Sequence, residues 1–288
     1  MREFEFLEPA TLEDASRLLA QHGENARAYA GGTALILALR QRLVSPTHVV
    51  SLARLEALRG ITFDAKTGLR IGALTRHAEL AKSDLVARHV PMLASMAAHL
   101  ANPQVRNQGT LGGNLCYADP ATDPPTCLLA LDAEIEIASA RGSRRLSISD
   151  FFVDYYTTAL EPDEIVVAVH VPAPAVGFAG AYTRHLRTAA EHRPLVNVAV
   201  TGRRNGNRLS DVRVAVGAST PIPARVPRAE EVLGGGDITP GRIAEAATAA
   251  SEDIFAVSDG RGDEAYRRAM VRVVARRTMH TLCGLPQE

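Results

Sequence analysis

Two short glycine motifs are the residues in this sequence with the strongest potential for chemistry. YAGGT occupies residues 29–33, and TLGGN occupies residues 110–114. Glycines let successive backbone N–H groups converge on one point, and such a nest at the start of a helix attracts an anion. A tight turn capped by threonine is the simpler explanation of YAGGT taken alone. Two such motifs in one chain, each following an apolar segment, predict a diphosphate ligand held between two lobes.

The second motif lies within NQGTLGGNLCYADPATDPP, residues 107–125. We expect this segment to be a long loop, because its glycines, prolines and aspartates suit neither helix nor strand. Thr110 and Asn114 would add side-chain hydrogen bonds to a ligand. Asp119 and Asp123 are each explained, taken singly, as turn or cap residues. Cys116 is best explained as a small packing residue.

Other kinds of site are disfavoured. The nine histidines include no HxH or HExxH pair, so we expect no metal site. The chain also lacks a GxSxG elbow, a GxGxxG fingerprint and a Walker lysine. Its 32 basic residues balance its 32 acidic residues, which predicts no nucleic-acid partner. Arginines recur at helical spacing near the C-terminus and predict a solvated or partner-facing surface: Arg267, Arg268, Arg272, Arg276 and Arg277.

Composition predicts a globular chain of two or three folding units. It has 288 residues, of which 46% are hydrophobic and 22% charged. No apolar run is long enough to span a membrane, and MREFEFLEP lacks the apolar core of a signal peptide. The three cysteines form no CxxC pair, which indicates reduced thiols and a cytoplasmic location.

Strand and helix patterns alternate through residues 1–56. We expect strands at 3–9, 26–30 and 48–52, with helices at 11–23 and 34–43. This β-α-β-α-β order usually builds a parallel sheet.

From residue 57 the pattern becomes more mixed. We expect a hairpin at 61–73, a helical region at 75–100, a helix and two strands between 127 and 148, and an apolar strand at 164–172. SDFF should open a short helix capped by Ser149.

The proline- and glycine-rich stretch 172–180 is the clearest domain boundary. Beyond it we expect three antiparallel strands, with a tight Asn-Gly-Asn turn at 205–207 between the second and third. A short helix ending at 234–236 and two C-terminal helices should complete this part.

Several motifs occur together in a characteristic order: AGGT at 30–33, IGALTRHAEL at 71–80, QVRNQGTLGGNLCYADPATDPP at 104–125, DFF at 150–152 and LEPDEIV at 160–166. In these motifs the chain resembles the FAD-binding medium subunit of molybdenum hydroxylases, the carbon monoxide dehydrogenase and xanthine dehydrogenase group. The resemblance extends to YRRAMVRVVARR near the C-terminus.

The resemblance implies an α+β protein with a vanillyl-alcohol-oxidase (PCMH)-type FAD-binding fold. Two α/β subdomains would span 1–56 and 57–172. A C-terminal domain at 177–288 would hold a three-stranded antiparallel sheet with helices. FAD would be the cofactor, and this chain would contribute no catalytic acid or base and no metal ligand.

Cofactor-binding roles are also implied by the resemblance. The first glycine turn would wrap the FAD pyrophosphate, and the second would approach the flavin from the other lobe. Asp123 would bond ribityl or ribose hydroxyls, and Arg184 would lie near the flavin ring. Ala34 replaces a serine or aspartate of many relatives, which removes one side-chain hydrogen bond. The implied residues are Ala28, Tyr29, Ala30, Gly31, Gly32, Thr33, Ala34, Leu35, Leu100, Thr110, Gly112, Gly113, Asn114, Cys116, Asp123, Ile165, Val166 and Arg184.

The implied function is electron transfer within a three-subunit hydroxylase. The partners would be a large molybdenum-cofactor subunit and a small subunit with two [2Fe–2S] clusters, assembled as a dimer of heterotrimers. FAD would pass electrons from those clusters to an external acceptor. Two alternatives are a stand-alone flavin oxidase of the same fold and a nucleotide-binding scaffold without flavin.

Overall fold

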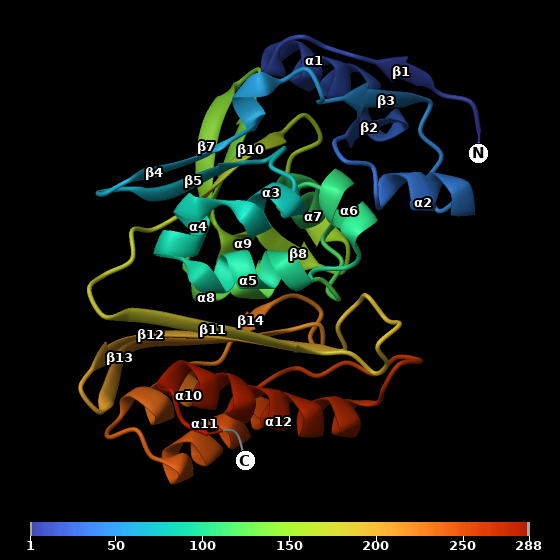
Figure 1. The fold of residues 1–288 in the computed structure, drawn as a ribbon. Coiled ribbons are helices and arrows are strands. Elements are labelled where there is room, and N and C mark those ends of the chain that lie inside the picture. Colours follow the sequence, from blue (N-terminus) through green and yellow to red (C-terminus); the bar gives the residue numbers. More distant parts are fainter. Residues whose placement is uncertain (1, 287–288) are drawn as a thin grey trace.

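Three successive stretches of the chain each build a separate main β-sheet (Figure 1). The computed structural model describes residues 2–286. The first sheet lies at one end of the molecule, the second in the middle, and the third between the middle part and a layer of C-terminal helices. The α+β class expected from the sequence is confirmed. Within the described residues, no helix is long and apolar enough to cross a membrane.

The first sheet is parallel, as the alternating pattern predicted. Strand β3 (His48–Ser51) lies between β1 (Glu5–Leu7) and β2 (Ala26–Tyr29) and pairs in parallel with both. The connecting helices are α1 (Leu12–His22) and α2 (Leu35–Gln41). Single-turn 3-10 helices η1 and η2 occupy Gly23–Asn25 and Glu56–Leu58.

The second sheet is antiparallel, with strand order β4-β5-β10-β6-β7. Its central strand β10 (Ile165–Val171) is buried along its whole length. Its other strands are β4 (Ile61–Asp64), β5 (Gly68–Gly72), β6 (Glu134–Ser139) and β7 (Gly142–Ser147). A separate two-stranded hairpin consists of β8 (Phe152–Asp154) and β9 (Thr157–Thr158).

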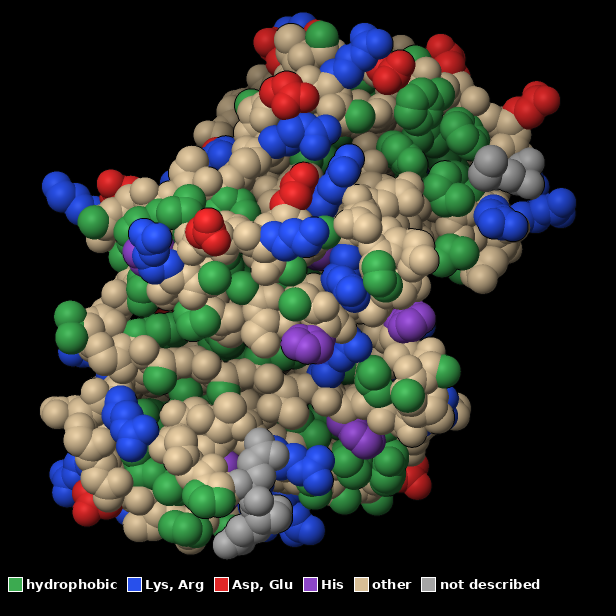
Figure 2. All heavy atoms as spheres, viewed as in Figure 1, with side chains coloured by type: hydrophobic (Ala, Val, Ile, Leu, Met, Phe, Trp, Pro, Cys, Tyr) green, Lys and Arg blue, Asp and Glu red, His purple; other side chains and the backbone are tan. Residues whose placement is uncertain are grey.

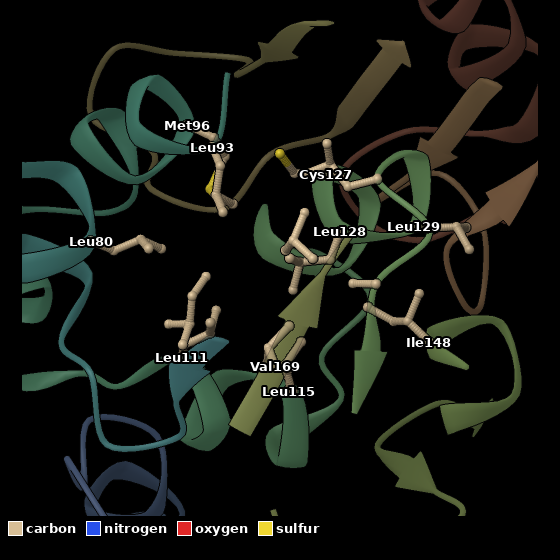
Figure 3. Packing of buried hydrophobic residues seen from close by; sticks show 14 of the residues in the cluster. Leu80, Leu93, Met96, Leu111, Leu115, Cys127, Leu128, Leu129, Ile148 and Val169 are labelled. Carbon is tan, nitrogen blue, oxygen red and sulfur yellow. The ribbon is translucent and has the colours of Figure 1, made fainter. Parts of the chain in front are cut away.

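Seven short helices belong to the same stretch of the chain as this sheet, and one of its faces packs against helices of this group. They are α3 (His77–Lys82), α4 (Asp84–His89), α5 (Pro91–His99), α6 (Pro103–Gln108), α7 (Leu111–Tyr117), α8 (Pro124–Ala130) and α9 (Ile148–Phe151). Figure 3 shows leucines of α3, α5, α7 and α8 converging on Val169 of β10. Helix α9 is capped by Ser147, so the prediction of Ser149 was wrong by two residues.

The expectation of a long loop at 107–125 was wrong, because most of this segment is helical. Helix α6 ends at Gln108, α7 occupies Leu111–Tyr117, and α8 begins at Pro124. Leu111 and Leu115 of α7 are completely buried. Burying two leucines stabilises the helix by more than its two glycines weaken it, so tertiary packing overrides the local propensity.

The third sheet contains the three expected antiparallel strands: β11 (Phe178–His185), β12 (Val196–Asn205) and β13 (Arg208–Gly217). A two-residue strand, β14 (Ala224–Arg225), adds a fourth, so the predicted three-stranded sheet was one strand short. The outer face is covered by helices α10 (Pro227–Gly234), α11 (Pro240–Glu252) and α12 (Glu264–Cys283).

The expected arginine surface on α12 was partly wrong, because Arg267 is completely buried. Its guanidinium donates to Asp259 and to the carbonyl oxygens of Leu195 and Ala218. A buried charge needs partners of this kind, since desolvation is otherwise costly. Arg267 therefore joins three loops of the C-terminal part, while Arg272 and Arg277 remain exposed.

Candidate cofactor site

The two glycine motifs meet in space, although they are far apart in the sequence. A Cβ atom built on Gly113 would lie 3.7 Å from the Cβ of Ala30. One built on Gly31 would overlap the carbonyl oxygen of Gln108 at 2.1 Å, so the two backbones touch there. Only glycine permits so close an approach of two chains. The structure therefore brings together the two halves of the site predicted from the sequence.

The first half of the site is a turn between β2 and α2. Gly32 has a positive φ of 71°, and a Cβ there would also collide with the Tyr29 ring at 2.5 Å. Ala30 to Ile36 are only partly buried. Helix α2 has Ala34 at its N-cap and no side-chain cap hydrogen bond. No side chain therefore accepts from the first N–H groups of α2, as expected when a small residue replaces serine or aspartate, and the N–H of Ile36 donates instead to the carbonyl oxygen of Gly32 at 2.9 Å.

The second half of the site is the start of α7. Thr110 caps this helix, its Oγ1 accepting from the N–H of Gly113 at 3.2 Å. The segment is held against the end of β5, where the N–H of Gly112 donates to the carbonyl oxygen of Ala73 at 2.8 Å. A Cβ on Gly112 would lie only 2.6 Å from that of Ala73. Gly112 is thus required for packing, whereas Gly113 faces the first half of the site.

Asn114 supplies a direct test of whether this candidate site fits a cofactor. Its Oδ1 atom is buried and has no hydrogen-bond partner in the described chain. A buried, unpaired amide oxygen costs about 1–3 kcal/mol, so native folds rarely retain one without a partner. FAD offers hydroxyl donors and a diphosphate for the neighbouring backbone N–H groups. The donors and acceptors present therefore fit FAD.

Asp123 and Arg184 are brought together at the boundary with the third sheet. Asp123 is 2% exposed, and its Oδ2 accepts from Nη1 of Arg184 at 3.1 Å. Its Oδ1 accepts from the hydroxyl of Tyr182 at 2.5 Å. Burial raises the pKa of Asp123, while Arg184 and the two hydrogen bonds oppose that shift. Burial also raises the pKa of Tyr182 well above its ordinary value, so the phenol remains a donor.

Asp123 does not cap α8 with its side chain, so the cap explanation fails for this residue. Asp119 does stabilise a turn, since Oδ1 accepts from the N–H of Ala121 at 3.0 Å. It also accepts from Arg193 at 2.6 Å. Both aspartates thus pair with arginines that follow the linker.

The remaining predicted residues lie in different environments. Leu100 is buried at the end of α5, and Cys116 and Ala28 are exposed. The side chains of Ile165 and Val166 are enclosed in two different apolar cores, on opposite faces of β10. Their contact with a ligand would therefore come through the backbone or the edge of the side chain.

Sequence reasoning did not single out His77. It is 2% exposed, and its backbone N–H donates to the carbonyl oxygen of Gly109 at 3.1 Å. Its Nδ1 atom has no hydrogen-bond partner in the described chain, and burial lowers the pKa of the imidazole to about 4. In the sequence, this residue could be noticed only as part of the motif IGALTRHAEL. A histidine at the start of a helix does not by itself indicate a functional site.

Comparison with known proteins agrees with this fold. Residues 2–174 match the family described as the FAD binding domain in molybdopterin dehydrogenase. Residues 181–282 match the CO dehydrogenase flavoprotein C-terminal domain. Together these matches define an FAD-binding oxidoreductase subunit.

Individual relatives are similar over almost their full length. The nicotine 6-hydroxylase medium subunit of Paenarthrobacter nicotinovorans is 37% identical, with 95% of each chain covered. The carbon monoxide dehydrogenase medium chain of Hydrogenophaga pseudoflava is 33% identical, with 96% of each chain covered.

Solved structures are equally similar. The chain superposes on carbon monoxide dehydrogenase from Hydrogenophaga pseudoflava with a TM-score of 0.94 at 33% identity, covering 98% of each chain. It superposes on quinoline 2-oxidoreductase from Pseudomonas putida 86 with a TM-score of 0.92 at 32% identity, again covering 98% of each. The chain belongs to the family of FAD-binding medium subunits of molybdenum hydroxylases.

Proposed function

We propose that this chain holds FAD as the electron-transfer subunit of a heterotrimeric molybdenum hydroxylase. The observation that carries the proposal is the close approach of the two glycine segments, Gly31 to Gln108 and Gly113 to Ala30, together with the unpaired Oδ1 of Asn114. When bound, FAD supplies a store for two electrons received from iron–sulfur clusters and released to an external acceptor. The protein supplies binding and orientation.

Within this site we assign different tasks to the predicted residues. The turn from Ala28 to Leu35 would hold the pyrophosphate through backbone N–H groups. The start of α7 would form the opposite wall, with Asn114 as a side-chain hydrogen-bonding group. Asp123, held by Tyr182 and Arg184, would present its carboxylate to cofactor hydroxyls. Leu100, Cys116 and the strand at Ile165 and Val166 would complete the surroundings.

The partners we propose are a large molybdenum-cofactor subunit and a small subunit with two [2Fe–2S] clusters, assembled as a dimer of heterotrimers. Several relatives are named as medium chains or medium subunits, which supports a multi-subunit assembly. We also propose a cytoplasmic location, supported by three free cysteines. The three sheets support domain boundaries at 1–56, 57–172 and 177–288.

Redox cycling of the flavin tests this function. The chain is expressed together with the proposed partner subunits, and flavin absorbance is followed under anaerobic conditions. We expect bound FAD to be bleached when the hydroxylase substrate is added to the complex, and not when it is added to the isolated chain. Turnover by the isolated chain would favour the stand-alone oxidase. A colourless chain that does not bind added FAD would favour the scaffold.

A further inference from the structure

His77 is a buried histidine whose ring lacks a hydrogen-bond partner. The histidine side chains that stand out in Figure 2 lie at the molecular surface, where water can bond to their ring nitrogens. His77 is only 2% exposed, and its Nδ1 atom is covered by protein atoms without a partner among the described residues. Leaving a buried polar atom unpaired is unfavourable, and native folds retain few such atoms without a functional reason.

The ring of His77 lies where the two glycine segments meet. The backbone N–H of His77 donates to the carbonyl oxygen of Gly109, and the N–H of Leu111 donates to the carbonyl oxygen of Thr75 at 2.9 Å. A Cβ atom built on Gly109 would lie 3.2 Å from Cδ2 of His77 and 3.3 Å from Oγ1 of Thr33. The side chains of His77 and Thr33 therefore approach the same position of the second glycine segment.

Thr33, the last residue of the AGGT motif, has the chemistry that Nδ1 of His77 lacks. Its side chain is partly buried, and its hydroxyl makes no hydrogen bond within residues 2–286. Burial lowers the pKa of His77 to about 4, so the imidazole is neutral at pH 7. A neutral imidazole has one donor and one acceptor nitrogen, and a hydroxyl can both donate and accept. The Thr33 hydroxyl is therefore a suitable partner for Nδ1 in either tautomer.

We propose that His77 is a positioning residue for FAD. When the first glycine turn closes on the pyrophosphate, the hydroxyl of Thr33 makes the hydrogen bond that Nδ1 lacks, which fixes this turn against the second glycine segment. The imidazole acts through Thr33 because protein atoms cover Nδ1 and keep the cofactor from direct contact with it. The inference rests on the proposed function, which assigns the pyrophosphate to this turn.

Titration of the flavin-free full chain with FAD tests this role. His77→Leu keeps an apolar side chain of similar bulk but removes the hydrogen-bonding group. It should weaken FAD binding about five-fold, the effect of one net hydrogen bond. His77→Asn places an amide group close to the position of Nδ1 and should retain most of the affinity. Thr33→Val removes the hydroxyl and should weaken binding at least as much as His77→Leu.

A double-mutant cycle separates this role from general damage to the fold. In the Thr33→Val background, His77→Leu should weaken FAD binding by less than about two-fold, because the hydrogen bond is already absent. Nitrogen NMR of the wild-type chain gives a second readout. The Nδ1 resonance of His77 should shift when FAD is added, and it should shift much less in Thr33→Val.

Matched controls come from a histidine and a core residue elsewhere. His99→Leu removes an exposed histidine at the end of α5, and Val274→Ala weakens the buried core beneath α12. Both variants should bind FAD as tightly as the wild type. Val274→Ala should do so although its melting temperature falls, because the cavity lies away from the glycine segments.

Wild-type affinity in His77→Leu would overturn the proposal. So would an equal loss in His77→Asn, or full additivity of His77→Leu with Thr33→Val, since a ring that only packs gives those results. If His77→Leu does not fold, the Nδ1 resonance decides, and an unchanged resonance overturns the proposal. A chain that binds FAD normally but is not bleached in the complex would overturn electron transfer and leave this role intact. A wild-type chain that does not bind FAD would overturn both.

Discussion

Arg184 and Asp123 form a buried ion pair between the FAD-binding region and the C-terminal domain, with Nη1 of one 3.1 Å from Oδ2 of the other. Asp119 and Arg193 form a second pair across the same boundary. In addition, the hydroxyl of Thr201 in β12 donates to the carbonyl oxygen of Ala130 at 2.8 Å. The boundary is therefore a specific interface and positions the third sheet beside the proposed cofactor site.

Replacing Asp123 by asparagine should destabilise the protein. The variant leaves the Arg184 guanidinium without its charge partner, and breaking a buried pair in this way costs about 3–5 kcal/mol. Urea unfolding at pH 7 measures this loss. The exposed pair of Asp211 with Arg203 provides the control, and Asp211→Asn should change stability by no more than about 0.5 kcal/mol. Equal effects of the two variants would contradict the buried role.

Replacing Gly113 by valine should lower FAD occupancy. The new side chain would fill the space between the two glycine segments, where its Cβ would lie 2.8 Å from Oγ1 of Thr110 and 3.7 Å from Ala30. We expect at least a ten-fold weaker affinity for FAD, a loss of about 1.4 kcal/mol. Flavin absorbance per chain measures occupancy, and circular dichroism checks folding. Gly260→Val, at a position with open space, should retain FAD. A fully flavinated Gly113 variant would count against the assigned site.

Stability should fall between pH 7 and pH 5 because of His77. Burial lowers its pKa in the folded chain to about 4, below the unfolded value of about 6.5. The neutral form therefore stabilises the fold fully above pH 6.5, and this contribution is lost as the pH falls towards 4. Between pH 7 and pH 5 the loss is about 2 kcal/mol.

The variant His77→Phe should remove this part of the pH dependence. Denaturant titrations at the two pH values measure it, and exposed His192→Phe serves as the control. If the stability of His77→Phe falls between pH 7 and pH 5 as much as that of the wild type, another group causes the pH dependence.

Replacing Arg267 by methionine should be far more damaging than replacing Arg272. Methionine keeps most of the length of Arg267 but leaves the carbonyl oxygen of Ala218 without its guanidinium donor and removes the closer of the two arginine partners of Asp259. The carbonyl oxygen of Leu195 loses one of its donors and keeps the hydroxyl of Ser219. We expect a loss of about 3 kcal/mol or more. Arg272 is exposed on the same helix, so Arg272→Met should have little effect. Comparable melting temperatures for the two variants would show that the loops do not depend on Arg267.

The strands and most helices could be predicted because local pattern and tertiary packing agree. The hairpin around Gly206 and the parallel pairing of β1, β2 and β3 follow from turn chemistry and alternation. The segment 107–125 was mispredicted for the opposite reason. Its composition disfavours a helix locally, whereas the buried positions of Leu111 and Leu115 impose one.

The sequence by itself determined that two glycine motifs exist, that each follows an apolar element, and that their order matches one family. Glycine motifs can be recognised in a sequence because no other residue type permits such close backbone contacts. Only the tertiary structure decided that the segments around Gly31 and Gly113 lie against each other, that Arg184 pairs with Asp123, and that Arg267 is buried while Leu37 is exposed. Those relationships depend on which surfaces of distant segments pack together, and no local pattern encodes that packing.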